Sequence, residues 1–101
     1  MAPASCSLDD TALARQLGRY RTVGRESTVV VRDARRVVVD VGPGVPGALV
    51  QELVAIERGC CPHLHVDWRP AGRRLTVAVR EAGHAQALSA IAAALAPATP
   101  V

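Results

Sequence analysis

The chain has 101 residues, about the length of one domain, and half of them are hydrophobic, which is enough to fill a single core. The formal net charge is +3, and because every basic side chain is an arginine, this excess indicates a compositional bias as readily as an anion-binding site. No apolar run approaches the roughly 20 residues that cross a bilayer, and the start lacks the regions of a signal peptide. We therefore expect a cytoplasmic protein. In the cytoplasm thiols are kept reduced, so we expect free thiols rather than a disulfide framework.

Three amphipathic helices and two hairpins are predicted along the chain. The predicted elements are a helix over 8–21, strands over 27–32 and 35–41, a helix over 46–58, strands over 64–69 and 75–80, and a helix over 83–95. Helical spacing of apolar side chains, as at Leu13 and Leu17, indicates the helices. Strict alternation indicates the third strand, whereas consecutive valines in the first two strands leave their buried face open. Gly59 is placed to end the second helix in the left-handed conformation.

The element order α-β-β-α-β-β-α predicts an α+β fold. Two hairpins supply a four-stranded antiparallel sheet, and three helices bury their apolar stripes on one face of it. We expect a tail over 1–7, a single domain over 8–95 and a second tail over 96–101. The other face or an edge of the sheet is then available for self-association, and we expect a homo-oligomer.

The corner between the second helix and the third strand is the candidate functional site. Two of the three cysteines and two of the three histidines lie between Cys60 and His65. The candidate residues of this corner are Cys60, Cys61, His63, His65, Asp67 and Trp68, preceded by Glu57. A corner between regular elements holds side chains rigidly and leaves them accessible, so we expect the function to lie here.

The position of Cys60 and Cys61 disfavours nucleophilic or redox catalysis. A reactive thiol needs a lowered pKa, and the negative end of a helix dipole opposes thiolate formation. A disulfide between adjacent cysteines also closes a strained ring. A soft ion deprotonates its thiol ligands on binding, and thiolates select Hg(II), As(III) or Cu(I). We therefore expect an ion-binding protein rather than an enzyme, with Cys6 as third ligand if the first helix begins near the end of the second.

Other interpretations of the same residues stay open. Zinc could use the three cysteines with a histidine as fourth ligand, although adjacent cysteines are an unusual zinc clip. Each cysteine could equally be a small buried core residue. Glu57, His63, His65, Asp67 and Trp68 are candidate auxiliary ligands, or the lining of a small-ligand pocket. The arginines around the hairpin turns lack aromatic neighbours, so we do not expect nucleic-acid binding.

The element order resembles the pterin-4a-carbinolamine dehydratase fold over about residues 10–95. That family has His-His-Pro where this chain has Cys60-Cys61-Pro62, and an aromatic residue where this chain has Trp68. Its later catalytic histidine would fall near Ala78. The resemblance implies the fold, and a dehydratase-like enzyme or small-ligand pocket at this corner is the alternative function. The imidazoles of the dehydration chemistry are replaced in this chain, so the activity is not carried over.

A closer likeness in local pattern is to a group of small uncharacterised bacterial proteins. They have a Cys-x-Leu near the N-terminus and a Glu-x-x-Cys-Cys-Pro corner, and Cys6-Ser7-Leu8 and the stretch 57–62 match this pattern. His63 stands where such sequences have an aromatic residue. The group is associated with mercury and arsenic resistance. The resemblance implies binding of a soft metal or metalloid ion, in resistance, delivery or sensing.

Overall fold

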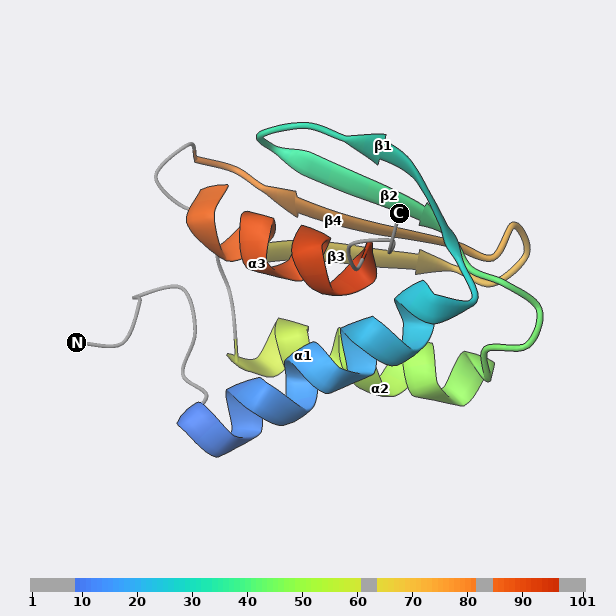
Figure 1. Cartoon of the computed structure of the whole chain (residues 1–101), viewed down its shortest axis with the longest axis horizontal. Coiled ribbons are helices and arrows are strands. Elements are labelled where there is room, and N and C mark those ends of the chain that lie inside the picture. The colour runs from blue at the N-terminus through green and yellow to red at the C-terminus, as the bar shows by residue number, and fades with distance from the viewer. Residues whose placement is uncertain (1–8, 61–63, 82–84, 97–101) are drawn as a thin grey trace, which may run out of the picture.

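The computed structural model describes residues 9–60, 64–81 and 85–96, and at Cys60 it describes the backbone. The elements are α1 (Asp10–Arg25), β1 (Thr28–Arg32), β2 (Arg36–Asp40), α2 (Gly47–Cys60), β3 (Leu64–Arg69), β4 (Arg74–Val79) and α3 (Ala85–Leu95) (Figure 1). Their order confirms the predicted α-β-β-α-β-β-α sequence of elements and the α+β fold. No helix in these ranges combines the length and the hydropathy needed to cross a membrane.

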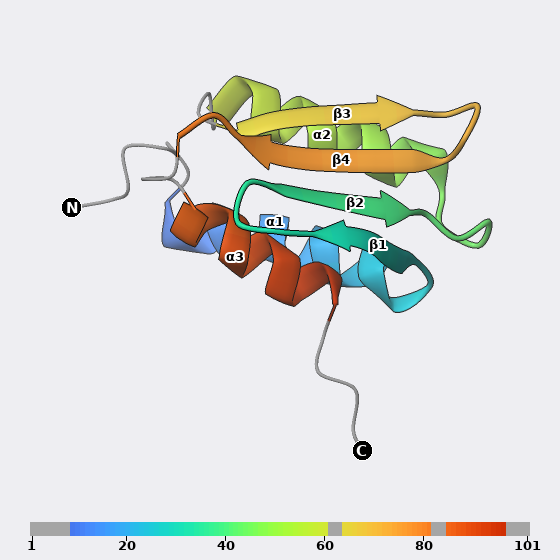
Figure 2. The ribbon, with the colours of Figure 1, turned by 90° about the horizontal axis from the view of Figure 1, so that it is seen from above.

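The four strands form one antiparallel sheet in the order β1-β2-β4-β3. The two hairpins therefore meet along β2 and β4, which pair from Arg36↔Ala78 to Asp40↔Arg74. All three helices lie on one side of the sheet (Figures 1 and 2). The helices α2 and α3 contact the strands, and α1 packs against both of these helices. The predicted arrangement of helices on one face is thus confirmed.

The core lies between the sheet and the helices and consists almost entirely of aliphatic side chains. Its most deeply buried strand residues are Val37, Val39, Val66, Leu75 and Val77, and its most deeply buried helical ones include Val50, Leu53, Leu88 and Leu95. In β2, Val37 and Val39 are fully buried on the helix side. Alternation then places Val38 on the other face of the sheet. Val38 is also buried, at 6% exposure, so the structure identifies which valines of β2 face the helices rather than a single buried face.

A β-bulge in the edge strand β1 shifts its register against β2. Val29 lies opposite Val39, whereas Arg32 lies opposite Val37, with the register shift between Val29 and Val31. Both partners in β2 face the helices, so the bulge brings both Val29 and Arg32 to the helix side of the sheet. A bulge of this kind also makes an edge strand a poorer template for pairing with another chain.

Two helix ends differ from the prediction. The helix α1 continues to Arg25 rather than ending at residue 21, because Val23 and Gly24 extend its buried face. The helix α2 continues through Cys60, and no described glycine has a positive φ, so the prediction that Gly59 ends the helix in the left-handed conformation is wrong. Cys60 therefore belongs to the last turn of α2.

Candidate functional site

The start of α1 and the end of α2 lie at the same end of the molecule (Figures 1 and 2). The helices cross so that Gln16 and Tyr20 of α1 both reach Glu57 in the last turns of α2. At this end β3 also begins, with Leu64 paired to Val79 at the end of β4. The fold thus brings the chain segment that follows Cys6 and the segment that carries Cys60 to a common end of the molecule.

A buried carboxylate lies on the last turns of α2, one helical turn before Cys60. Glu57 is only 2% exposed, and its two oxygens accept hydrogen bonds from different side chains of α1. Gln16 Nε2 donates to Glu57 Oε1 at 3.1 Å and also to the Leu53 carbonyl at 3.0 Å. The hydroxyl of Tyr20 donates to Glu57 Oε2 at 3.1 Å. Burying a carboxylate is costly unless such partners replace water, and α1 supplies them here.

The buried cluster of Gln16, Tyr20 and Glu57 is connected to the surface through one arginine. Arg19 Nη1 donates to Gln16 Oε1 at 3.1 Å, which orients the amide so that its nitrogen faces α2. Arg19 Nε forms an ion pair with Glu52 Oε1 at 2.8 Å, where the Glu52 side chain is 55% exposed. The arginine therefore closes the outer side of the α1–α2 interface and holds the buried amide in one orientation.

His65 and Asp67 lie on the sheet face that points away from the helices. They pair with Ala78 and Thr76 of β4, in alternation with the buried residues of β3. His65 is exposed, and Asp67 forms an ion pair with Arg69 at 3.3 Å. Neither side chain lies on the side of Glu57, so the described structure does not bring these candidate residues together with it.

Trp68 lies on the helix side of β3 but toward the start of α2, away from Cys60. Its ring packs against the core, and the Arg73 guanidinium stands over it at 5.8 Å from the ring centroid. Arg73 also donates to the backbone carbonyls of the segment that precedes α2, at Val41, Gly42 and Val45. Among described side chains, Trp68 Nε1 is the buried polar atom without a hydrogen-bond partner. Trp68 thus belongs to the packing around the β3–β4 turn rather than to the cysteine corner.

The predicted thiol ligands lie at the limits of what the structure describes. The residues Cys6, Cys61 and His63 and the side chain of Cys60 lie outside the described part, so their mutual distances are predictions. Within 9–60, 64–81 and 85–96, no three histidine, cysteine or acidic side chains cluster as metal ligands. Glu57 is the one predicted site residue for which the structure shows a buried polar environment beside this corner.

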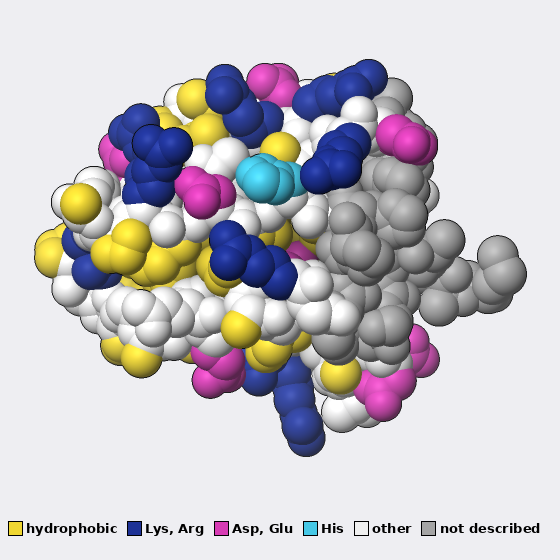
Figure 3. All heavy atoms as spheres, turned by 180° about the vertical axis from the view of Figure 1, so that it is seen from behind, with side chains coloured by type: hydrophobic (Ala, Val, Ile, Leu, Met, Phe, Trp, Pro, Cys, Tyr) yellow, Lys and Arg dark blue, Asp and Glu magenta, His cyan; other side chains and the backbone are white. Residues whose placement is uncertain are grey.

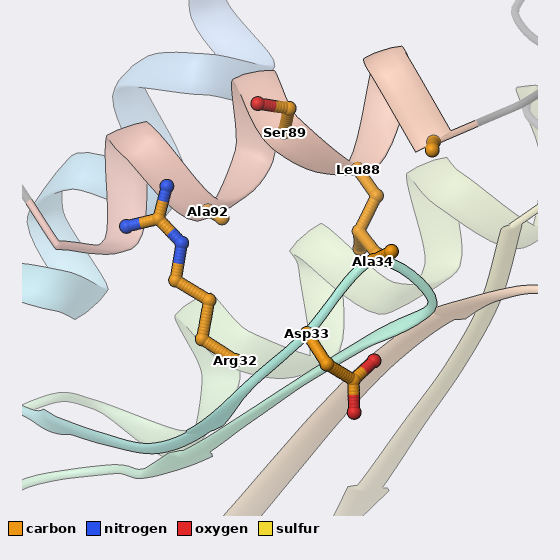
Figure 4. Close-up of a pocket in the computed structure, with 7 residues that line it drawn as sticks. Arg32, Asp33, Ala34, Leu88, Ser89 and Ala92 are labelled. Carbon is orange, nitrogen blue, oxygen red and sulfur yellow. The ribbon is translucent and has the colours of Figure 1, made fainter.

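A second candidate site is a shallow hollow of about 210 Å³ between the β1–β2 turn and α3 (Figure 4). Arg32 and Ser89 supply polar groups at its rim, above a surface of alanine and leucine side chains. Asp33 borders the hollow, but its Oδ1 accepts hydrogen bonds from the backbone N–H groups of Arg35 and Arg36, at 2.8 and 2.9 Å, and so holds the turn. One guanidinium and one hydroxyl over small apolar side chains do not define a ligand.

Charges of both signs are interspersed on the surface. Figure 3 shows basic side chains alternating with acidic ones above a band of hydrophobic side chains. Arg74 and Asp40 pair at 2.7 Å on the open face of the sheet, beside the pair of Arg69 and Asp67. These pairs neutralise much of the charge that this face would otherwise present.

No protein-family model, curated protein or solved structure matches this chain.

Proposed function

We propose that the protein binds a soft metal or metalloid ion through the thiolates of Cys60 and Cys61, with Cys6 as third ligand. The observation that carries this proposal is that the start of α1 and the end of α2 lie at the same end of the molecule (Figure 1). The role that we propose is sequestration, delivery or sensing of the ion. The protein would act in the cytoplasm, where thiols stay reduced.

The length of the N-terminal segment limits where Cys6 can lie. The chain from Cys6 to Asp10 spans at most about 14 Å, since each residue adds no more than about 3.6 Å. Hydrogen bonds from Gln16 and Tyr20 to Glu57 fix how α1 lies on the last turns of α2. The position of Asp10 relative to the last turns of α2 is therefore fixed by the fold, which supports the proposal of Cys6 as third ligand.

Thiolate chemistry favours a soft ion over an enzyme mechanism at this position. Cys60 lies in the last turn of α2, where the partial negative charge of the helix end disfavours a free thiolate. A bound ion takes the place of the thiol protons. Its positive charge is larger than the partial negative charge of the helix end, so the ion stabilises the thiolates at this position. Hg(II), As(III) and Cu(I) are the ions that sulfur ligands select, and Zn(II) is the harder alternative.

Native mass spectrometry of the reduced protein tests the proposal. One equivalent each of Hg(II), As(III), Cu(I) and Zn(II) is added in the presence of a competing small thiol. We expect one ion to bind stoichiometrically, with two or three protons displaced, and we expect the double change Cys60→Ser with Cys61→Ser to abolish the adduct. The Cys6→Ser variant shows whether a third sulfur binds, and the same spectra give the oligomeric state, which we propose to be a homo-oligomer.

Two controls make the outcome decisive. Circular dichroism tests whether the serine variants retain the fold. His65→Ala removes an exposed imidazole from the sheet face that points away from the helices. If the competing thiol removes every ion from the wild-type protein, or if the double serine variant binds as the wild type does, ion binding by this corner is excluded.

A further inference from the structure

Both edges of the sheet are obstructed for pairing with another chain. The edge strand β1 carries a bulge, which hinders the addition of a further strand. At the other edge, Val79 N donates to the Arg35 carbonyl just before β2, so alternate residues of β4, Val77 among them, direct their backbone groups to β2. Val66 of β3 lies opposite Val77 and therefore directs its carbonyl to the free edge. Arg58 of α2 donates to this carbonyl at 3.2 Å and covers the edge there. Association through the sheet is thus left to its open face, the one that points away from the helices.

The open face has small side chains at its centre and charged ones around them. Its residues on β2, β4 and β3 lie in three rows across the strands: Arg36, Ala78 and His65; Val38, Thr76 and Asp67; Asp40, Arg74 and Arg69. Val38 is 6% exposed, and Thr76 and Ala78 are half-buried, so no long side chain rises from the centre. Another sheet could therefore pack on this centre at the usual separation of about 10 Å.

One ion pair of the open face has unused hydrogen-bonding capacity. Arg74 Nε and Nη2 both donate to Asp40 Oδ1, at 3.0 and 2.7 Å. Among the described residues, none donates to Asp40 Oδ2 and none accepts from Arg74 Nη1. The side chains of Arg74 and Asp40 are 51% and 47% exposed, and a pair so exposed to water contributes little to the stability of one chain. A second pair of the same kind, laid over the first, would use these groups.

We propose that the open face binds the open face of a second copy of this chain, around a two-fold axis that runs parallel to the strands between β2 and β4. This axis lays β2 of each copy on β4 of the other. Asp40 then faces Arg74 of the second copy, and Val38 faces Thr76. No like charges of these two strands are opposed, because the remaining pair sets an arginine over an alanine. These residues lie next to the axis, so the angle of about 30° between packed sheets displaces them little.

The charge pattern and the size of the open face define the kind of dimer. A two-fold axis across the strands, through the middle row, is disfavoured, because it would lay β3 on itself and bring the two Asp67 carboxylates together. The strands are five or six residues long, which at a spacing of about 4.8 Å gives the face a flat area of roughly 350 Å². A standard interface buries about 800 Å² per partner, so we expect a weak, reversible dimer. This inference rests on the homo-oligomer that we propose and is independent of the ion.

Sedimentation equilibrium of the reduced protein without added ions, from about 5 µM to about 1 mM, covers the range that a weak interface requires. The wild-type protein should show a dimer whose share rises with concentration. Asp40→Arg alone sets arginine over arginine, and Arg74→Asp alone sets carboxylate over carboxylate, so each variant should dimerise at least about 30-fold more weakly. An equimolar mixture of the two variants should restore the affinity of the wild type to within about tenfold, because opposite charges then meet at all four positions.

Mixing separates this interface from a defect within each chain, because one chain cannot repair the lost ion pair of another. Glu52→Arg is the matched control: it reverses an ion-paired carboxylate of α2, on the helix side of the molecule, and should leave the dimer unchanged. If a charge variant fails to fold by circular dichroism, Thr76→Arg decides, since it places a long charged side chain at the centre of the open face and should abolish the dimer.

The possible results separate this inference from the proposed ion binding, because no ion is present. If the wild-type protein stays monomeric over the whole range, the dimer is overturned. A mixture of folded variants that stays as monomeric as the separate variants overturns the arrangement of β2 on β4. Equal weakening by Glu52→Arg and Asp40→Arg would overturn it as well, because the face of the sheet would then not matter.

Discussion

Replacing Tyr20 by phenylalanine should destabilise the fold through a single lost hydroxyl. The ring is fully buried, and its hydroxyl donates to a carboxylate that is 2% exposed, at 3.1 Å. Phenylalanine fills the same space, so no large cavity forms and the cost is that of the hydrogen bond. A hydrogen bond to a charged group contributes about 1.5–3 kcal/mol.

The expected loss is therefore about 2 kcal/mol, which is a large share of the roughly 5–15 kcal/mol that stabilises a domain of this size. In a thermal melt it corresponds to a fall of the midpoint by about 10 °C. Urea unfolding of Tyr20→Phe, Glu57→Gln and the double variant gives the coupling energy between the two side chains. Thr22→Val is the matched control. The Thr22 hydroxyl donates to the Gly18 carbonyl at 3.0 Å in an exposed position, so removing it should cost less than about 0.5 kcal/mol. A loss for Tyr20→Phe no larger than this, or a coupling energy near zero, would refute the role given to the buried cluster.

Two further predictions concern packing and the turn that holds Trp68. Gly24→Ala should destabilise the protein by at least about 2 kcal/mol, because the new methyl group would collide with the backbone carbonyl of Leu95 at the end of α3. Gly18→Ala is the control in the same helix. Its methyl group would contact no other atom, so it should stabilise the protein by up to about 1 kcal/mol. Equal urea midpoints for these two variants would show that the α1–α3 contact is looser than described. Arg73→Lys should cost about 1–3 kcal/mol in the same assay, because an ammonium group cannot reproduce the fork that donates to three backbone carbonyls. A neutral effect would mean that water replaces these bonds.

Much of the fold was predictable because local periodicity and burial agree along most of the chain. The alternation of Leu64 and Val66 with polar residues correctly identified the buried face of β3, and helical spacing identified the three helices. The buried face of β2 was not predictable, because its valines are consecutive and the face depends on pairing with β4. The bulge in β1 likewise depends on its partner strand. The extra turn of α1 follows from Gly24, whose close approach to Leu95 is a tertiary contact with no local signal.

The position of the ion site stays a prediction, whereas the surroundings of Glu57 are described by the structure and were not predictable. The sequence pattern indicated Glu57 together with the cysteines, but nothing local indicated that its partners are Gln16 and Tyr20, which are 41 and 37 residues away in the chain. A glutamine on an amphipathic helix is normally solvent-exposed, so its burial at 1% exposure is visible only in the folded chain. The spacing of Gln16 and Tyr20 at i and i+4 is the one signal that could have suggested that both face the same neighbour.

The polar cluster is informative because an apolar one would serve stability at least as well. Buried hydrogen-bonded charges commonly contribute no more than well-packed hydrophobic side chains of similar volume, and the rest of this core is aliphatic. Hydrogen bonds are more directional than aliphatic contacts, so the bonds from Gln16 and Tyr20 to Glu57 favour the observed arrangement of α1 on α2. That arrangement determines where α1 begins relative to the last turn of α2. The proposed binding site, assembled from the segment before α1 and the end of α2, would depend on this arrangement.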